Sequence, residues 1–236
     1  MKTLLNTQKL PRLTLVLGVA GFTLRRMLYA VAVDHKNLLT FHPLSILLGA
    51  VTVAAIVMIL VGVLGWNRER IWPLWPGSWG LVTLLGGLGF GSVLFEGGFA
   101  DSRLILVRNI LALVAAAAMA VLVLLDKQGK KPSFLLYSAV SLFFAVHMVS
   151  CYQGWSSNPQ IQDYLFSLLG GVGLMLYTYH KAAAAVGFRK EKQMLATGLL
   201  TPFFCFVALS GTGYPILLLT GGYWVLVDVC KEFSGE

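Results

Sequence analysis

The sequence predicts an all-α, polytopic transmembrane helix bundle of about eight spans, with both termini on the cytoplasmic side. Of its 236 residues, 57% are hydrophobic and only 12% are charged, about half the charged share of an ordinary soluble domain. The apolar residues form eight long runs, and most basic residues fall in every second connector. Too little polar surface remains for a water-facing domain, so the bilayer is the expected solvent for most of the chain.

The eight apolar runs are expected as helices. In lipid, every backbone N–H and C=O must be bonded within the protein, and runs that do not alternate with a period of two achieve this only as helices. The expected segments are 13–33, 44–65, 79–97, 105–125, 133–153, 162–181, 194–211 and 214–230. With short connectors they use up the chain, so we expect one integral membrane domain, 1–236.

The last segment gives the weakest signal. The run from Pro215 to Val229 is short, and Gly221 and Gly222 interrupt it. A re-entrant hairpin of the last two segments is therefore the alternative to two complete spans.

The distribution of Lys and Arg predicts the orientation. Thirteen of the eighteen basic residues fall on the side of the N-terminus, and three, Lys36, Arg103 and Arg108, fall on the other. Cytoplasmic connectors carry the excess of basic residues. The chain is thus expected in a plasma (inner) membrane with both termini inside. The same rule accounts for the net charge of +8, so no nucleic-acid partner is expected. It also accounts for the basic connector 180–192, for which contact with anionic lipid or a cytoplasmic partner is the alternative.

A faint internal repeat suggests two halves, 1–131 and 132–236. The fourth segment ends in Val121–Lys127 and the eighth in Val225–Lys231, and the two strings are similar. A parallel four-plus-four repeat would pair the glycine-rich third segment with the seventh, which contains Pro202. Interrupted helices at corresponding positions of two halves are typical of transporter binding sites.

Arg25 and Arg26 lie inside the first apolar segment, where a charge is costly unless it faces a partner or a cavity. Neighbouring residues on a helix point about 100° apart, so at least one of them should face the bundle. Glu96 and Asp34 are the expected partners. An internal salt bridge with one arginine reaching the interface is the alternative to anion binding.

The connectors opposite the basic side hold a mixture of acids, bases, amides and histidines, which predicts a polar vestibule open to the outside. Arginine in such a pocket binds carboxylate or phosphate through paired, charge-assisted hydrogen bonds. Glu96 is expected as counter-charge or proton-coupled carboxylate, and His147 as a ligand-orienting group. The candidate ligand-binding residues are Arg25, Arg26, Glu96, Arg108, His147 and Asp163.

This pattern favours a small transporter, or a transporter-associated binding subunit, for an anionic or zwitterionic small molecule. One alternative is an enzyme acting on a lipid headgroup, with His147 and either Glu96 or Asp163 as acid and base. Another is a scaffold or sensor in which the charges only fix the packing. Oligomerisation stays open.

No motif in the sequence selects a reaction. It contains no GxSxG, Walker A or HExxH pattern, so the catalytic residues are unknown, and neither a metal nor a cofactor is expected. Cys151, Cys205 and Cys230 are expected as buried thiols. The tryptophans near the first inner connector, including Trp66 and Trp79, are expected as anchors at the membrane interface.

Overall fold

The computed structural model describes residues 9–32, 42–66, 79–96, 103–155, 161–211 and 213–234, apart from the side chains of residues 96, 154–155 and 161–163. Within these ranges the chain is an all-α bundle of eight helices. They are α1 (Leu10–Val31), α2 (Pro43–Leu64), α3 (Trp79–Glu96), α4 (Arg103–Lys127), α5 (Phe134–Trp155), α6 (Ile161–Ala185), α7 (Glu191–Ala208) and α8 (Pro215–Ser234). Each helix coincides with one predicted segment to within four residues at either end.

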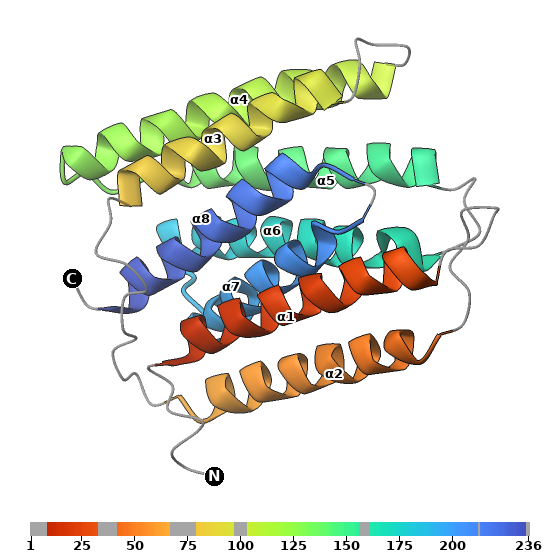
Figure 1. Cartoon of the computed structure of the whole chain (residues 1–236). Coiled ribbons are helices and arrows are strands. Elements are labelled where there is room, and N and C mark those ends of the chain that lie inside the picture. The colour runs from red at the N-terminus through yellow and green to blue at the C-terminus, as the bar shows by residue number, and fades with distance from the viewer. Residues whose placement is uncertain are drawn as a thin grey trace.

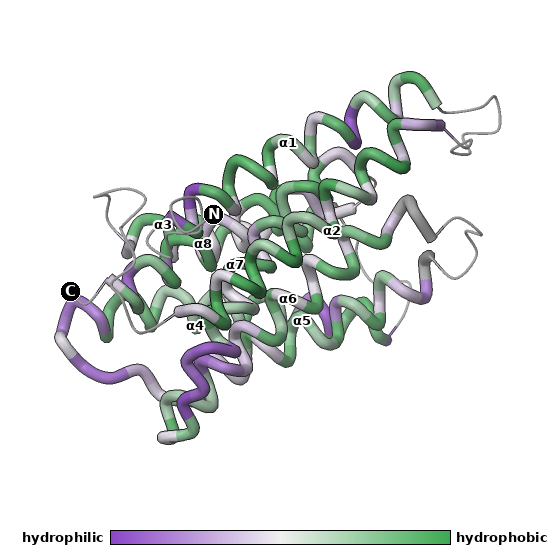
Figure 2. The backbone as a smooth tube through the Cα atoms, turned by 90° about the horizontal axis from the view of Figure 1, so that it is seen from below, coloured by the Kyte–Doolittle hydropathy of each residue, from purple (hydrophilic) through white to green (hydrophobic). Residues whose placement is uncertain are grey.

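Several of these helices are long and apolar enough to cross a membrane. Among the described residues, α1, α2, α4 and the part of α5 up to Gln153 meet both criteria, and Trp79–Phe95 of α3 is a shorter apolar helix. Large hydrophobic side chains such as Val53, Leu88 and Leu135 are exposed on outer faces, and the apolar character runs along the helices in Figure 2. The protein is thus a helical membrane protein. How many of the eight helices cross the membrane stays a prediction.

Successive helices run in opposite directions, so that α1 begins and α8 ends at the same end of the bundle (Figure 1). We call this end, which also holds the turns 128–133 and 186–190, the basic end. The opposite end, where α1 finishes and α8 begins, is the far end. Hydrophilic residues are concentrated near the helix ends rather than along their middles (Figure 2).

The core of the bundle lies around α7. This helix packs against α1, α2, α6 and α8, and nearly all its side chains from Met194 onward are buried. From α6 the packing continues through α5, α4 and α3 to α8, which returns to α7. Helices α1 and α2 lie on one flank of this arrangement and the pair α3 and α4 on the other (Figure 1).

The last two segments form continuous helices, and whether they cross the membrane or form a re-entrant hairpin stays a prediction. Helix α7 continues through Pro202, and α8 continues through Gly221 and Gly222. A Cβ atom on Gly222 would lie 2.7 Å from Cβ of Cys205. The glycines thus allow α8 to approach its neighbours closely, which is how small residues act in membrane helices.

The packing does not show the four-plus-four repeat. Helix α3 packs along α8, and the repeat would require an equivalent contact between α7 and α4. No such contact is among the main helix pairs of the described residues.

Candidate functional site

A small polar cavity lies between α5, α6 and the beginning of α8, towards the far end. Its volume is about 20 Å³, which suffices for one water-sized group. We call it the polar cavity, and it is lined by Phe144, His147, Met148, Cys151, Ser167, Gly171, Gly213, Tyr214, Leu217 and Leu218. Four of these side chains, those of His147, Cys151, Ser167 and Tyr214, bring polar groups into an otherwise apolar wall.

His147 is held by its neighbours on both faces. Its ring stacks on Phe143, one turn earlier on α5, and meets Tyr214 edge to face with 4.6 Å between ring centroids. Nε2 lies 3.5 Å from Sγ of Cys151, one turn further on. Stacking therefore fixes the ring, while Nδ1 is buried and makes no hydrogen bond to the described residues.

Two unsatisfied polar atoms meet at this cavity. The described residues contain three buried side-chain polar atoms without a hydrogen-bond partner, and two of them, Nδ1 of His147 and Oγ of Ser167, belong to residues lining the polar cavity. Each such atom costs about 1–3 kcal/mol. A hydrogen-bonding partner for either atom would recover that energy.

Arg108 of α4 supplies a positive charge beside the cavity. Its side chain is only 2% exposed. Nη1 donates to the hydroxyl of Tyr214 at 2.8 Å, and Nε and Nη2 donate to Oδ1 of Asn109. These bonds use three of the five guanidinium N–H groups. All the acceptors are neutral, and Arg108 forms no ion pair with any described side chain.

Arg25 of α1 approaches the same region from the other side of the α7–α8 turn. It is 1% exposed, donates to the carbonyl of Val207 at 3.2 Å, and lies over the ring of Phe166. A Cβ on Gly211 would lie 2.7 Å from Nη2 of Arg25, so glycine leaves room for the guanidinium. Arg25 therefore ties α1 to the end of α7 and does not line the cavity.

The structure thus brings together three of the predicted residues, Arg25, Arg108 and His147, around the turn that follows Val207. Arg26 is exposed and points away from them. Glu96 and Asp163 lie on α3 and α6, but their side chains are outside the described part of the chain. Of the three gathered residues, only His147 lines the polar cavity, which within the described part is water-sized rather than a wide vestibule.

Three polar lining residues were not predicted. Cys151 follows His147 by four residues, and this spacing alone places both on one helical face. Tyr214 precedes Pro215 in a turn, and Ser167 lies in an apolar helix. No local signal marks either as a cavity residue.

A second polar cluster ties three helices together near the basic end. Asp228 of α8 is buried and accepts from Nε1 of Trp79 at 2.7 Å and from the hydroxyl of Tyr177 at 2.6 Å. Lys181 of α6 lies 3.1 Å from Asp228 and donates to Glu232 at 2.9 Å. Trp79, expected as an interface anchor, is therefore a hydrogen-bond donor to a buried carboxylate.

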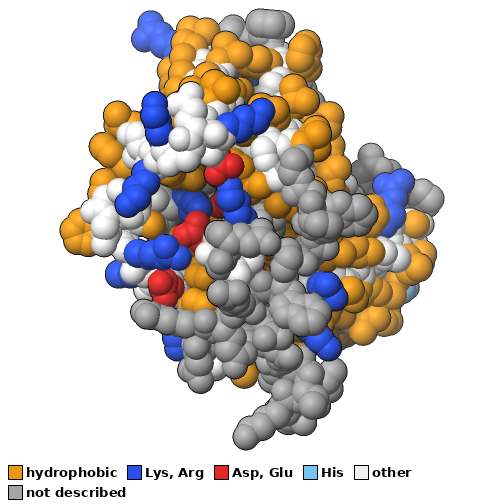
Figure 3. Space-filling view, turned by 90° about the vertical axis from the view of Figure 1, so that its left-hand side faces the viewer, with side chains coloured by type: hydrophobic (Ala, Val, Ile, Leu, Met, Phe, Trp, Pro, Cys, Tyr) orange, Lys and Arg blue, Asp and Glu red, His pale blue; other side chains and the backbone are white. Residues whose placement is uncertain are grey.

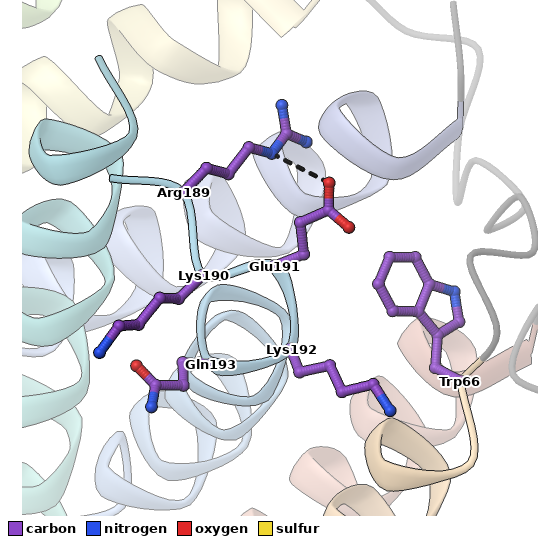
Figure 4. Close-up of a pocket in the computed structure, with 6 residues that line it drawn as sticks. All are labelled: Trp66, Arg189, Lys190, Glu191, Lys192 and Gln193. Atoms are coloured by element: carbon purple, nitrogen blue, oxygen red, sulfur yellow. Dashed lines mark ion pairs between the residues drawn. The ribbon is translucent and has the colours of Figure 1, made fainter. Parts of the chain in front are cut away.

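A wider hollow opens at the start of α7 and has a volume of about 400 Å³ (Figure 4). It is lined by Trp66, Arg189, Lys190, Glu191, Lys192 and Gln193. Arg189 pairs with Glu191 at 3.5 Å, and Lys192 donates to the carbonyl of Leu64. The side chain of Lys190 extends away from Trp66 (Figure 4). These side chains are mostly exposed, so the hollow is a surface feature of the basic end.

Among the described residues, no group of three or more His, Cys, Asp or Glu side chains is arranged to hold a metal ion. No protein-family model, curated protein or solved structure matches the chain. The functional argument therefore depends on the geometry of this chain alone.

Proposed function

We propose that this membrane protein binds a small anionic or zwitterionic molecule at the polar cavity and Arg108, and that it acts as a small transporter or as the binding subunit of one. The observation that carries the proposal is that Arg108 is buried and, among the described residues, bonds only to neutral partners. A buried cation without a counter-charge is costly in a membrane domain. An anionic ligand would supply that counter-charge.

The proposed contacts follow from the unused hydrogen-bonding groups. The two remaining N–H groups of Arg108 would donate to a carboxylate or phosphate oxygen in charge-assisted bonds. Ser167 and Nδ1 of His147, which have no partners among the described residues, would orient the polar remainder of the ligand. Because the cavity accommodates one water-sized group, a larger ligand requires Tyr214 to move aside.

Two carboxylates stay in the proposal, Asp163 as a ligand contact and Glu96 as a counter-charge or proton-coupled group. Asp163 precedes Ser167 by four residues on α6, a spacing that places both on one face of the helix. Glu96 ends α3, which packs beside α4 and therefore beside the helix that carries Arg108. Arg26 has no part in the proposal because its side chain is exposed.

The proposed topology has eight spans and both termini in the cytoplasm. The alternation of helix direction (Figure 1) and the concentration of basic residues at one end support both features. With this orientation the polar cavity lies towards the outer side of the membrane.

A thermal-unfolding screen of the purified protein in detergent tests the proposal. The ligands are small carboxylates, phosphates, amino acids and lysophospholipids, because only a ligand that prefers the folded state raises the unfolding midpoint. We expect one anionic class to stabilise the wild type and the Arg103→Gln control, but not Arg108→Gln or Ser167→Ala. Arg103 is an exposed arginine on the same helix, so it controls for the loss of one charge. Equal responses from Arg103→Gln and Arg108→Gln would contradict the proposal.

One observation favours an enzyme acting on a lipid headgroup as the second candidate. The 3.5 Å contact between Cys151 and His147 places a thiol beside an imidazole base, as in cysteine-dependent acyl transfer. In that case Cys151→Ala would abolish release of fatty acid from a lysophospholipid and would leave binding intact. The scaffold alternative has its own outcome. If no ligand raises the unfolding midpoint of the wild type and Arg25→Ala lowers it, the charged residues only fix the packing.

A further inference from the structure

A cleft at the basic end, separate from the polar cavity, is suited to hold a phosphate group. Its volume is about 510 Å³. We call it the lysine cleft, and it is lined by Lys131, Pro132, Tyr137, Lys181, Ala184, Ala185, Gly187, Arg189 and Glu232. A smaller neighbouring cavity shares Pro132, Tyr137, Lys181 and Glu232 with it, and its other charged lining residues are Lys130, Lys231, Asp126 and Asp228. In Figure 3, which faces this end of the bundle, basic side chains surround a few acidic ones.

The cleft lies at a membrane surface. Its rim includes the turn 128–133, which joins α4 to α5, and both of these helices are long and apolar enough to cross a membrane. A short turn between two such helices must lie at the level of the lipid headgroups. Tyr137 is three residues into α5, about 4.5 Å below its start, so the cleft reaches from the headgroup level into the bundle.

The acidic groups inside the cleft are already neutralised. Lys181 pairs with Asp228 and Glu232, and Arg189 pairs with Glu232 at 3.0 Å. Lys130 and Lys131, on the turn, form no ion pair with the described residues and are exposed. The cleft is therefore lined by three basic side chains and one acidic side chain, with Lys130 adding a further positive charge next to it.

Tyr137 provides the cleft with a hydrogen-bond donor on a buried side chain. The side chain is only 4% exposed, its ring lies beneath Nζ of Lys181 at 5.5 Å, and its hydroxyl makes no hydrogen bond to the described residues. The ammonium of Lys181 bonds to two carboxylates and keeps one N–H of its three. The hydroxyl of Tyr137, the ammonium of Lys181 and the ammonium of Lys131 thus line the lysine cleft together.

We propose that the lysine cleft binds the phosphate of an anionic phospholipid headgroup from the leaflet at the basic end. Phosphate oxygens would accept from Lys131, Tyr137 and the remaining N–H of Lys181, while the acyl chains would lie along the apolar exposed side chains beside the cleft, such as Val186 and Phe188. Basic pockets between membrane helices recognise such headgroups. This inference is independent of the ligand proposed for the polar cavity.

The test is a lipid titration of the thermal-unfolding midpoint in detergent. Phosphatidylglycerol, phosphatidylcholine and inorganic phosphate are compared at equal ionic strength. We expect phosphatidylglycerol to stabilise the wild type, and its apparent affinity to fall about fivefold in Lys131→Gln, the factor that one basic residue contributes at an anionic surface. Tyr137→Phe should also weaken binding, although it changes no charge.

The matched control is Lys190→Gln. Lys190 is exposed at the same end but lines the hollow of Figure 4 rather than the lysine cleft, so its loss should leave the affinity within about twofold. Equal losses in Lys190→Gln and Lys131→Gln would mean diffuse attraction and would overturn the proposal. Full affinity in Tyr137→Phe would overturn it too, as would stabilisation by inorganic phosphate alone, which would indicate a site for a free anion.

Discussion

The hydroxyl of Tyr214 accepts a hydrogen bond of 2.8 Å from Nη1 of Arg108 and thereby joins α4 to the residue that precedes α8. The tyrosine ring also lies against His147. One side chain thus links the buried cation to the cavity with the unsatisfied polar atoms. The position of this ring decides whether a ligand in the cavity could reach Arg108.

Removing the Tyr214 hydroxyl tests that link. Tyr214→Phe leaves Arg108 buried with one partner fewer, so we expect the folded state to lose about 1–3 kcal/mol, the cost of an unsatisfied buried donor. The measurement is the thermal-unfolding midpoint in detergent. Tyr152→Phe is the control because Tyr152 is 61% exposed. Equal midpoints for the two variants would show that the bond contributes nothing.

The charge of Asp228 should be needed for stability. Asp228→Asn removes the carboxylate that faces buried Lys181, and breaking a buried ion pair typically costs about 3–5 kcal/mol. Here Glu232 also contacts Lys181, so we expect a loss at the lower end of that range. Asp126→Asn, at a side chain that is 44% exposed, should cost much less. Replacing Lys181 by Met in the Asp228→Asn background should restore part of the lost stability, and no recovery would contradict the pairing.

Close helix packing predicts that replacing Gly222 by alanine destabilises the protein, whereas replacing Gly49 does not. A Cβ on Gly222 would lie 2.7 Å from Cβ of Cys205, whereas a Cβ on Gly49 would meet nothing within 4 Å. Gly222→Ala should therefore destabilise the protein by about 1–3 kcal/mol through overpacking. Gly49→Ala should be neutral or stabilising by up to about 1 kcal/mol, because alanine is the better helix former. Unfolding midpoints compare the two, and a stable Gly222→Ala protein would mean that α8 and α7 are packed less closely.

The eight-span topology predicts which turns share a side of the membrane. Turns 128–133 and 186–190 are separated by two helices, α5 and α6, so both should lie on one side. Single cysteines at Lys131 and Lys190, in a chain whose three native cysteines are replaced by alanine, should react alike with a membrane-impermeant thiol reagent in oriented vesicles. Labelling of one position without the other would exclude this topology.

The helices could be predicted from sequence, but their contacts could not. Long apolar runs without a period of two must be helical in lipid, so the segment expected at 44–65 appears as Pro43–Leu64. The hydrogen bond between Trp79 and Asp228 joins residues 149 positions apart, and no local pattern encodes such a pairing. The sequence shows only that Trp79 lies near a connector, which predicts a membrane anchor and not a bond to Asp228.

The candidate site was predicted in part. Arg25 is singled out by sequence because a charge inside an apolar segment is costly, and Arg108 because it falls among the polar residues opposite the basic side. Both are buried. Their separate roles depend on the α7–α8 turn, where Arg25 contacts Val207 and Arg108 contacts Tyr214. Ser167 could not be predicted, because serines are common in membrane helices and only the fold shows that its hydroxyl has no partner among the described residues.

The most direct test of the central claim is the unfolding midpoint of wild type and Arg108→Met, each measured with and without the anion that stabilises the wild type. Arg108 has no counter-charge among the described residues. If it is kept for a ligand, removing its charge should not lower the midpoint of the unliganded protein, since functional residues are often held at a cost in stability. The response to the anion should then be lost. An Arg108→Met variant that still responds to the anion, or that melts well below wild type without it, would contradict the account.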